Sequence, residues 1–250
     1  MFRNAQIAVV VPAFNESRLI ASTLRAVPSY VDHIVVVDDG SHDATASCAE
    51  GVAKLDPRLI VLRHAHNAGV GKALGTGYQR ALAEGADVVV VMAGDGQMHP
   101  DDLAALLAPV VAGHADYAKG NRLAHPEVLR RMPLTRLVGN EVLSRLTRVA
   151  TGLYVHDSQC GYTALHRRVA ERLAWNELWP GYGYPNDLLG MLQRLNARVC
   201  DVVVRPVYAD EESGIRLRHA LFVIPYVLLR VLFRRLRRQD VATASRQAES

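Results

Sequence analysis

Short apolar runs, each separated from the next by a helix-length segment, constrain this chain more than any other feature. They are rich in valine and isoleucine, continuous rather than alternating, and lie at residues 7–11, 34–37, 59–62 and 88–92. Continuous apolar strands are expected where a sheet is covered on both faces. Helical patterns lie between the runs, at residues 18–27, 44–55 and 72–84. We therefore predict an α/β domain with a mostly parallel, Rossmann-like sheet flanked by helices.

The later part of the chain gives no sign of a second folded domain. A sequence of 250 residues that is 50% hydrophobic can form one sizeable core. No Ser/Gly linker, repeat or low-complexity segment interrupts it. After Arg122 the alternation becomes less regular, with a helical stretch at 140–151 and a Gly/Pro/Tyr loop at 179–185. We interpret this half as an elaboration of the same domain, which then covers residues 1–214.

A basic amphipathic segment follows the domain. The formal net charge of +4 is local, because residues 216–238 hold seven arginines and no acid. The apolar stretch 220–229 would cover roughly 15 Å as a helix, about half of a ~30 Å hydrocarbon core, so it cannot span a bilayer. In a helix, one face of this segment is apolar and carries Leu229, Leu232, Phe233 and Leu236. The other face carries Arg230, Arg234, Arg237 and Arg238.

This pattern is typical of a helix that lies in a membrane interface. We predict such a helix at residues 215–238 and a disordered tail at 239–250. The alternative is a helix packed on the core with a solvated charged face. A basic terminal segment beside an apolar run favours an anionic membrane surface over nucleic acid as the partner.

The cysteines and the N-terminus indicate the compartment. Cys48, Cys160 and Cys200 are widely spaced and include no CxxC pair, which favours neither a disulfide framework nor a zinc site. The first residues lack the charged start, apolar stretch and cleavage site of a signal peptide. We expect a cytoplasmic protein that is peripheral on the inner face of the cell membrane.

Polar clusters follow the first two predicted strands, where ligands bind in open parallel sheets. After the first strand, Asn15 and Glu16 either hydrogen-bond a nucleoside or cap the next helix. After the second, the segment DDGSHD, which begins with Asp38 and Asp39, places three carboxylates within six residues. Such crowding is unfavourable unless donors are shared. A base or ribose would supply these donors; the alternative is a turn with Asp43 as a helix cap.

The third and fourth strands are followed by a glycine-rich segment and by an acidic turn. In the segment NAGVGKALGTG the backbone could approach a diphosphate, with Lys72 adding positive charge. It matches neither the P-loop nor the dinucleotide fingerprint. In the segment AGDGQ, Asp95 and Gln97 are two positions apart, so both oxygens could face one hard cation such as Mg²⁺. The alternative for Asp95 is a plain glycine-containing turn.

Taken in order, VVPAFNES, VDDGSHDAT, NAGVGKALGTGYQRA and GDGQMHPDDL resemble the nucleotide-binding motifs of glycosyltransferase family 2. KGNRL, DSQCGYTAL, YGYPNDLL and RPVYADEESGIR resemble the acceptor-side motifs of its dolichol-phosphate mannose synthase branch and of bacterial polyprenyl-phosphate relatives. The resemblance extends over residues 6–216 and implies a GT-A type fold. It implies that the nucleoside is lined by Pro12, Ala13, Glu16 and Asp38.

The resemblance also implies that Asp95 and Gln97 meet the metal, Mg²⁺ or Mn²⁺, and the diphosphate. Arg122, with Arg131 or Arg136, would contact phosphates. One departure matters: family members usually carry Asp-x-Asp at the metal site, whereas this chain has Ala93 at the first position. The loss of one charged ligand is expected to weaken metal binding.

The function implied is inverting transfer of a hexose from a GDP- or UDP-hexose to a polyprenyl phosphate. Negative charge develops on the leaving diphosphate, so the metal on Asp95, together with Lys72 and Arg122, would stabilise it. A phosphate acceptor is already ionised and needs no strong base. A hydroxyl acceptor would need one, and Asp187 or Asp157 are then the candidates. Their alternatives are a charge at a helix start and a turn.

Other functions remain open at this point. One is transfer to a soluble saccharide, peptide or small molecule. Another, motivated by Ala93, is a catalytically silent scaffold that binds nucleotide sugars. A sugar nucleotidyltransferase is disfavoured, because the glycine-rich segment follows the third strand instead of opening the chain.

Overall fold

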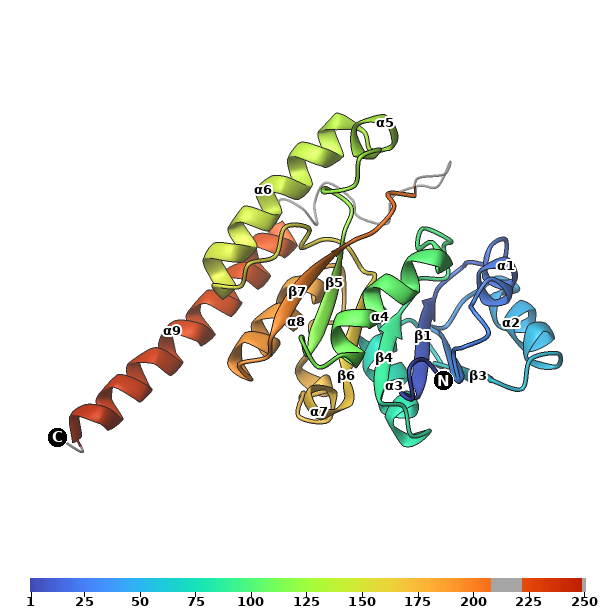
Figure 1. Ribbon diagram of the computed structural model, residues 1–250, viewed down its shortest axis with the longest axis horizontal. Coiled ribbons are helices and arrows are strands. Elements are labelled where there is room, and N and C mark those ends of the chain that lie inside the picture. Colours follow the sequence, from blue (N-terminus) through green and yellow to red (C-terminus); the bar gives the residue numbers. More distant parts are fainter. Residues whose placement is uncertain (208–221, 249–250) are drawn as a thin grey trace.

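A computed structural model describes residues 1–207 and 222–248, with side chains up to residue 237. A seven-stranded sheet with helices on both faces forms the body (Figure 1). The strand order is β3-β2-β1-β4-β6-β5-β7, and only β6 runs antiparallel to its neighbours. The strands are β1 (Ile7–Ala13), β2 (His33–Asp38), β3 (Leu59–Arg63), β4 (Val88–Val91), β5 (Tyr117–Asn121), β6 (Thr163–His166) and β7 (Val199–Val203).

The helices fill the connections between strands. Short 3-10 turns, η1 (Pro100–Asp102) and η2 (Trp175–Glu177), accompany them. The α-helices are α1 (Ile20–Arg25), α2 (Thr45–Ala53), α3 (Val70–Ala83), α4 (Leu103–Val111), α5 (Val128–Arg131), α6 (Leu134–Thr151), α7 (Arg167–Ala170), α8 (Tyr184–Arg194) and α9 (Ile224–Ala248). The strands and helices predicted for the first part of the chain are confirmed.

The continuous apolar strands divide their side chains between two cores. Alternate residues of β1 point to opposite faces, so Val9 packs with α1, α2 and α4, whereas Val10 packs with α3. Both residues are fully buried. This two-sided burial explains why the runs contain no polar alternation.

The strand order reverses beside β1. The chain adds β2 and β3 on one side of β1 and then returns to place β4 on the other side. The crevice at the carboxyl ends of β1 and β4 is therefore a topological switch point, where open α/β sheets bind ligands. The backbone N–H of Gly94 donates a hydrogen bond to the carbonyl of Pro12 (3.4 Å), which brings the two strand ends together.

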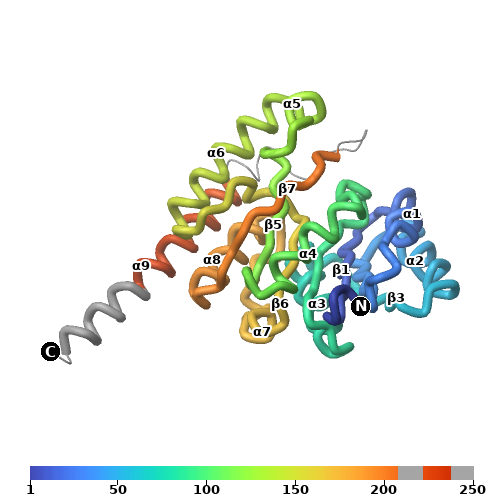
Figure 2. The backbone as a smooth tube through the Cα atoms, in the orientation of Figure 1, coloured from blue at the N-terminus to red at the C-terminus, as the bar shows by residue number. Residues whose placement is uncertain are grey.

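The C-terminal helix α9 packs beside α6 and α8 (Figure 2). Ile224, Val227 and Val231 bury one side of α9 in a small third core. The predicted boundary between residues 214 and 215 falls among residues 208–221, outside the described residues. Helix α9 continues through residues 239–248, where the sequence predicts a disordered tail. Among the described residues, no helix is both long and apolar enough to cross a bilayer.

Candidate active site

The predicted polar clusters gather at one edge of the sheet, as the parallel strands require. Ala13 is paired with Asp38, and Asp38 with Arg63, at the carboxyl ends of β1, β2 and β3. Strand β5 is antiparallel to β6 and therefore runs in the same direction as β4. Arg122, which follows β5, thus emerges at the same edge as Asp95, which follows β4.

The loops after β1 and β2 are hydrogen-bonded to each other. The backbone N–H of Asn15 donates to Oγ of Ser41 (2.9 Å), and the N–H of His42 donates to Oδ1 of Asn15 (3.0 Å). The N–H of Glu16 donates to Oγ1 of Thr45 (2.7 Å). Asn15 has a φ of 57°, a left-handed conformation that asparagine tolerates. Asn15 therefore fixes the loops after β1 and β2 to each other through contacts within the protein.

Asp43 stabilises the first turn of α2. Its Oδ1 accepts a hydrogen bond from the N–H of Thr45 (3.0 Å), and its Oδ2 accepts one from the N–H of Ser17 (3.1 Å). Burial acts to raise the pKa of Asp43, but the hydrogen bonds from Thr45 and Ser17 outweigh it and lower that pKa to about 2. The N-cap of α2 is Ala44 and not Asp43, so the predicted cap is wrong, but hydrogen bonds within the protein account for this third acid of the cluster.

Asp38 and Asp39 are both buried but have different partners. Asp39 accepts hydrogen bonds from the N–H groups of Ala68 (3.0 Å) and Gly69 (2.7 Å), and its Oδ1 lies 2.6 Å from Nδ1 of His64. Asp39 is therefore an anchor for the loop before α3. Oδ2 of Asp38 lies 3.2 Å from Nε of Arg63 and has no hydrogen-bond partner within the described part of the chain. Asp38 is the acid better placed to accept a donor from a nucleoside.

The glycines before and within α3 serve packing, which the sequence did not reveal. The N–H of Gly71 donates to the carbonyl of Pro180 (2.7 Å). If Gly69 carried a side chain, its Cβ atom would lie 2.4 Å from the carbonyl oxygen of Pro180. A Cβ atom added to Gly71 would lie 2.0 Å from the carbonyl oxygen of Trp179. Nζ of Lys72 donates to the carbonyl of Asn176 (2.8 Å). The N-terminus of α3 thus supports residues 176–180, and these glycines need no phosphate to explain them.

We expect Gly71→Ala to lower the free energy of unfolding by about 1–3 kcal/mol, because backbone must move to admit the methyl group. Gly51→Ala is the control: it lies in the interior of α2, with nothing within 4 Å of the added atom. That change should stabilise the protein by about 0.5–1 kcal/mol. Urea unfolding of both variants measures the difference, and an equal effect would contradict the packing interpretation.

The turn after β4 provides the candidate metal ligands. The N–H of Gln97 donates to Oδ1 of Asp95 (3.0 Å), and Gly96 has a φ of 72°. Burial raises the pKa of Tyr184 at the start of α8, and the charges of Cys160 and Asp95 raise it further. Within residues 1–207 and 222–237, no group of three or more His, Cys, Asp or Glu side chains could hold a metal ion. One carboxylate and one amide oxygen fit Mg²⁺ or Mn²⁺ only if substrate phosphates and water complete the shell.

Ala93→Asp should strengthen metal binding, because it returns a second carboxylate to this turn. We expect the Kd for Mn²⁺ in the presence of a nucleoside diphosphate to fall about tenfold or more. Electron paramagnetic resonance of free Mn²⁺ measures it. Ala93→Asn, which adds an oxygen without charge, is the matched control. Equal Kd values for the wild type and Ala93→Asp would show that position 93 does not face the metal.

Arg122 is held by a buried carboxylate. Its Nε and Nη2 lie 2.7 and 3.0 Å from Oδ2 and Oδ1 of Asp157, which has no exposed surface. Burial acts to raise the pKa of Asp157, but the charges of Arg122 and Lys119 lower it. A paired carboxylate with a lowered pKa is a poor proton acceptor, so the geometry favours Asp157 as a positioning residue for Arg122 and not as a general base. Lys119, missed in the sequence, is buried beside it and donates to the carbonyl of Cys160 (2.5 Å).

Asp187 is also enclosed by the protein. It lies in the first turn of α8 with no exposed surface, and its Oδ2 accepts a hydrogen bond from the N–H of Trp179 (2.9 Å). The same oxygen is 3.8 Å from Nη2 of Arg230 on α9. This position fits the alternative of a helix-start charge, but Oδ1 of Asp187 has no hydrogen-bond partner among the described residues, so the role of a base stays a prediction. Arg131 pairs with Glu127 (2.8 Å) on the surface of α5, and Arg136 lies in the first turn of α6.

Comparison with known proteins is consistent with this site. The family described as glycosyl transferase family 2 matches residues 8–174. A polyprenol monophosphomannose synthase from Mycolicibacterium smegmatis is 32% identical, covering 86% of this chain and 84% of that protein. A UDP-N-acetylglucosamine–dolichyl-phosphate N-acetylglucosaminyltransferase from Methanococcus voltae is 30% identical, with coverage of 82% and 86%.

A solved structure has the same fold. Glucosyl-3-phosphoglycerate synthase from Mycobacterium tuberculosis, in complex with Mn²⁺, UDP-glucose and phosphoglyceric acid, superposes with a TM-score of 0.69. It is 24% identical, covering 92% of this chain and 80% of that one. The likeness confirms the predicted GT-A type fold.

Proposed function

Because the chain belongs to glycosyl transferase family 2 and is a glycosyltransferase, we propose that it moves a hexose from a GDP- or UDP-hexose to a polyprenyl phosphate, with inversion. The observation that carries the proposal is the convergence of Asp38, Asp95 and Arg122 at one edge of the sheet. The names of the two curated relatives support a polyprenyl phosphate as the acceptor.

Each of these residues has a distinct task in the proposed reaction. Buried Asp38 accepts hydrogen bonds from the nucleoside. Asp95 and Gln97 would hold a divalent metal, which would supply positive charge to the leaving diphosphate. Arg122, fixed by Asp157, presents a rigid guanidinium where phosphate charge develops. Asp157 already neutralises part of the positive charge of Arg122. Arg122 therefore acts chiefly through hydrogen bonds to the phosphate, and its N–H donors need no reorganisation because Asp157 holds the side chain in place.

The partners of the buried carboxylates favour a phosphate acceptor over a hydroxyl acceptor. Asp157, one of the two candidate bases, is occupied by Arg122, whereas Asp187 is bound through Oδ2 and has no hydrogen-bond partner for Oδ1 among the described residues. A hydroxyl acceptor would require a base within hydrogen-bond reach. An ionised phosphate requires none, so the arrangement supports direct attack by a phosphate oxygen on the anomeric carbon.

The proposal is tested with purified protein, a panel of UDP- and GDP-hexoses labelled in the sugar, and undecaprenyl or dolichyl phosphate with Mg²⁺ or Mn²⁺. We expect a labelled product that extracts into organic solvent. Label transferred only to soluble saccharides would overturn the lipid acceptor. Donor binding without any transfer or hydrolysis would instead support the silent scaffold.

We also propose that the protein attaches to the inner face of the membrane through α9 and α6. One side of α9 is exposed and apolar and includes Tyr226, Leu229, Phe233 and Leu236, whereas Leu232, which the sequence places on the same face, packs against the third core. Helix α6 adds a second apolar stripe, which the sequence did not reveal: Leu134, Val138, Val142, Leu146 and Val149. Two adjacent helices with exposed apolar faces and arginine-rich flanks suit an anionic bilayer surface. The three cysteines are unpaired, which is consistent with a reducing compartment.

The combined change Val138→Ser and Val149→Ser should weaken binding to vesicles about tenfold or more, because each side chain loses apolar contact with lipid. Stability should change little, since both side chains are more than half exposed. Leu55→Ser removes an exposed leucine remote from α6 and serves as the control. Vesicle flotation measures binding. Equal flotation of the two variants would exclude α6 from the contact.

A further inference from the structure

A cluster of buried charges surrounds the pair formed by Arg122 and Asp157. Lys119 of β5 has no exposed surface, and it is paired in register with Asp201 of β7, so the two side chains lie on the same face of the sheet. Burial lowers the pKa of Lys119, while Cys160, Asp157 and Asp201 act to raise it. Two cations are thus set against two carboxylates. Buried charges are tolerated when they are paired, so each member of the cluster depends on the others.

The segment that carries Asp157 is attached to the sheet on both sides of this residue. Before it, Oδ2 of Asp201 accepts a hydrogen bond from the N–H of His156 (2.8 Å) and lies 2.6 Å from Nδ1 of the same residue. After it, the carbonyl of Cys160 accepts a hydrogen bond from Nζ of Lys119 (2.5 Å). The direction of the Asp157 carboxylate is therefore set by the strands β5 and β7.

Asp201 is an unusual residue for the middle of a strand. Aspartate is disfavoured in strands, and this side chain is only 14% exposed. Its Oδ1 is buried and has no hydrogen-bond partner among the described residues, which costs free energy. The contacts of Oδ2 with His156, together with the charge of Lys119, are what offset this cost.

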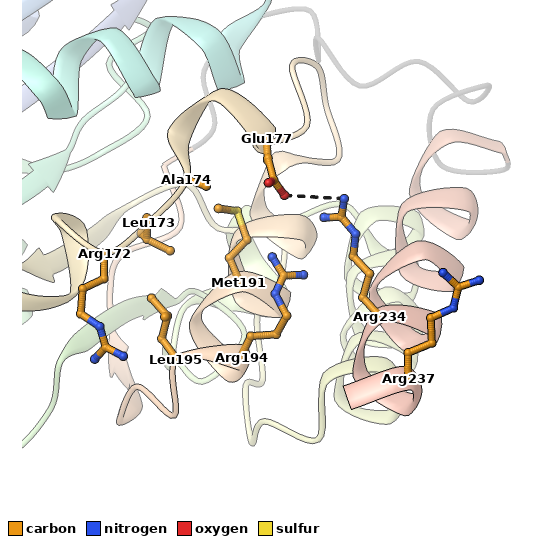
Figure 3. A pocket seen from close by; sticks show the side chains of 9 residues that line it. All are labelled: Arg172, Leu173, Ala174, Glu177, Met191, Arg194, Leu195, Arg234 and Arg237. Atoms are coloured by element: carbon orange, nitrogen blue, oxygen red, sulfur yellow. Dashed lines mark ion pairs between the residues drawn. The ribbon is translucent and has the colours of Figure 1, made fainter. Parts of the chain in front are cut away.

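Arginines elsewhere in the fold are not arranged in this way. A hollow of about 470 Å³ between α8 and α9 has Arg172, Arg234 and Arg237 among its lining residues (Figure 3). Arg234 pairs with Glu177 at 3.7 Å, whereas Arg172 and Arg237 are exposed and their guanidinium groups point away from that pair. Charges spread in this manner do not depend on one another. Those around Arg122 are mostly enclosed and do.

We propose that Asp201 is a positioning residue for the reaction: through His156 it fixes Asp157, and thereby holds the guanidinium of Arg122 where phosphate charge develops. Without Asp201, Asp157 is the only one of these two carboxylates left to balance Lys119, so it is drawn away from Arg122. A misplacement of about 1 Å can cost about a hundredfold in rate. The phosphate contact of Arg122 rests on the proposed function, whereas the fixing of Arg122 by Asp201 does not.

The Nε–H signal of Arg122 in the NMR spectrum of the full chain, labelled with ¹⁵N-arginine, reports the positioning directly. Its loss in Arg122→Lys identifies it. We expect Asp201→Ala to shift or broaden this signal. Asp201→Asn should do so less, because its amide oxygen still accepts the N–H of His156; it also serves if the alanine variant does not fold.

The matched control is Asp116→Asn. Asp116 directly precedes β5, at the opposite end of the same pair of strands, and its side chain is 8% exposed. Like Asp201 it accepts a backbone hydrogen bond, in this case from the N–H of Arg198 (2.8 Å). Both changes remove a carboxylate that joins β5 to β7, so only the link to Arg122 distinguishes them. The control should leave the Arg122 signal unchanged.

Sugar transfer measures the consequence for the reaction. Asp201→Ala should lower the rate about tenfold or more, while Asp116→Asn stays near the wild type. Urea unfolding shows that both variants are folded under the assay conditions. In the Arg122→Lys background, which keeps the charge but not the paired donors, Asp201→Ala should have little further effect, because both changes act on one group.

Three results would each overturn the inference: an unchanged Arg122 signal in Asp201→Ala, an unchanged rate in an active enzyme, or losses that multiply in the double variant. A wild type without transfer would overturn the proposed function instead. The Arg122 signal would then still decide whether Asp201 fixes that side chain.

Discussion

Asp95→Ala is expected to lower the rate of sugar transfer at least about a hundredfold, the largest effect among single changes to the site. Ala93 leaves Asp95 as the only carboxylate of the turn, so its removal leaves Gln97 and substrate oxygens alone with the cation. Transfer of labelled sugar at saturating Mn²⁺ measures the loss. Part of the activity should return at higher metal concentration, because the phosphates of the donor still bind the ion.

The matched control is Asp101→Ala. Asp101 lies six residues further along, two-thirds exposed, and pairs with Arg205 on the surface. Both variants lose one carboxylate, so a difference between them reflects position and not charge. Calorimetry of nucleoside diphosphate without metal should give similar Kd values for both. If Asp95→Ala retained full transfer at limiting Mn²⁺, the metal would have to be held elsewhere.

Asp157→Ala is expected to lower the free energy of unfolding by about 3–5 kcal/mol, because it leaves Arg122 without its buried carboxylate and removes a negative charge that acts on buried Lys119. Transfer should also fall, since Arg122 loses both hydrogen bonds that orient it. Asp157→Asn keeps the volume of the side chain and provides a second variant if the alanine variant does not fold. Urea unfolding and transfer assays measure the two effects separately.

The control for this prediction is Glu141→Ala, which breaks surface pairs with Arg145 and Arg148 on α6 and should cost about 0.2–1 kcal/mol. Acid provides a further readout. The pKa of Asp157 is lowered in the folded state, so its stabilisation is complete above the usual carboxyl pKa of about 4 and is lost as pH falls through the folded value. The two Asp157 variants should lack this part of the loss of stability at low pH. An unchanged acid profile would show that the pair contributes nothing to folding.

The sequence predicts the strands and the edge at which Asp38 and Asp95 meet, because continuous apolar runs and the polar residues after them are local features. It does not predict that Asp39 is engaged by hydrogen bonds within the protein. That outcome depends on the N–H groups of Ala68 and Gly69, about thirty positions later in the chain. Asp38 and Asp39 are adjacent and have the same local sequence pattern, so only tertiary contacts distinguish their roles.

The glycines of α3 illustrate the same limit. A glycine that makes room for a phosphate and one that makes room for another loop look alike in sequence, and only the carbonyls of Trp179 and Pro180 distinguish them. The apolar face of α6 was missed for a different reason. Apolar residues at helical spacing usually face a protein core. Only the fold shows which side of α6 packs on α9, and therefore which apolar side chains stay exposed.

The antiparallel strand β6 has a consequence for how activity is acquired. Because β6 runs against its neighbours, the segment before it reaches the catalytic edge and brings Asp157 to Arg122 from 35 positions away. Every residue proposed for the nucleoside and the metal precedes residue 98, whereas Arg122 depends on a carboxylate from the second half of the chain. The phosphate-contacting arginine is therefore oriented only when the second half of the chain has folded onto the first.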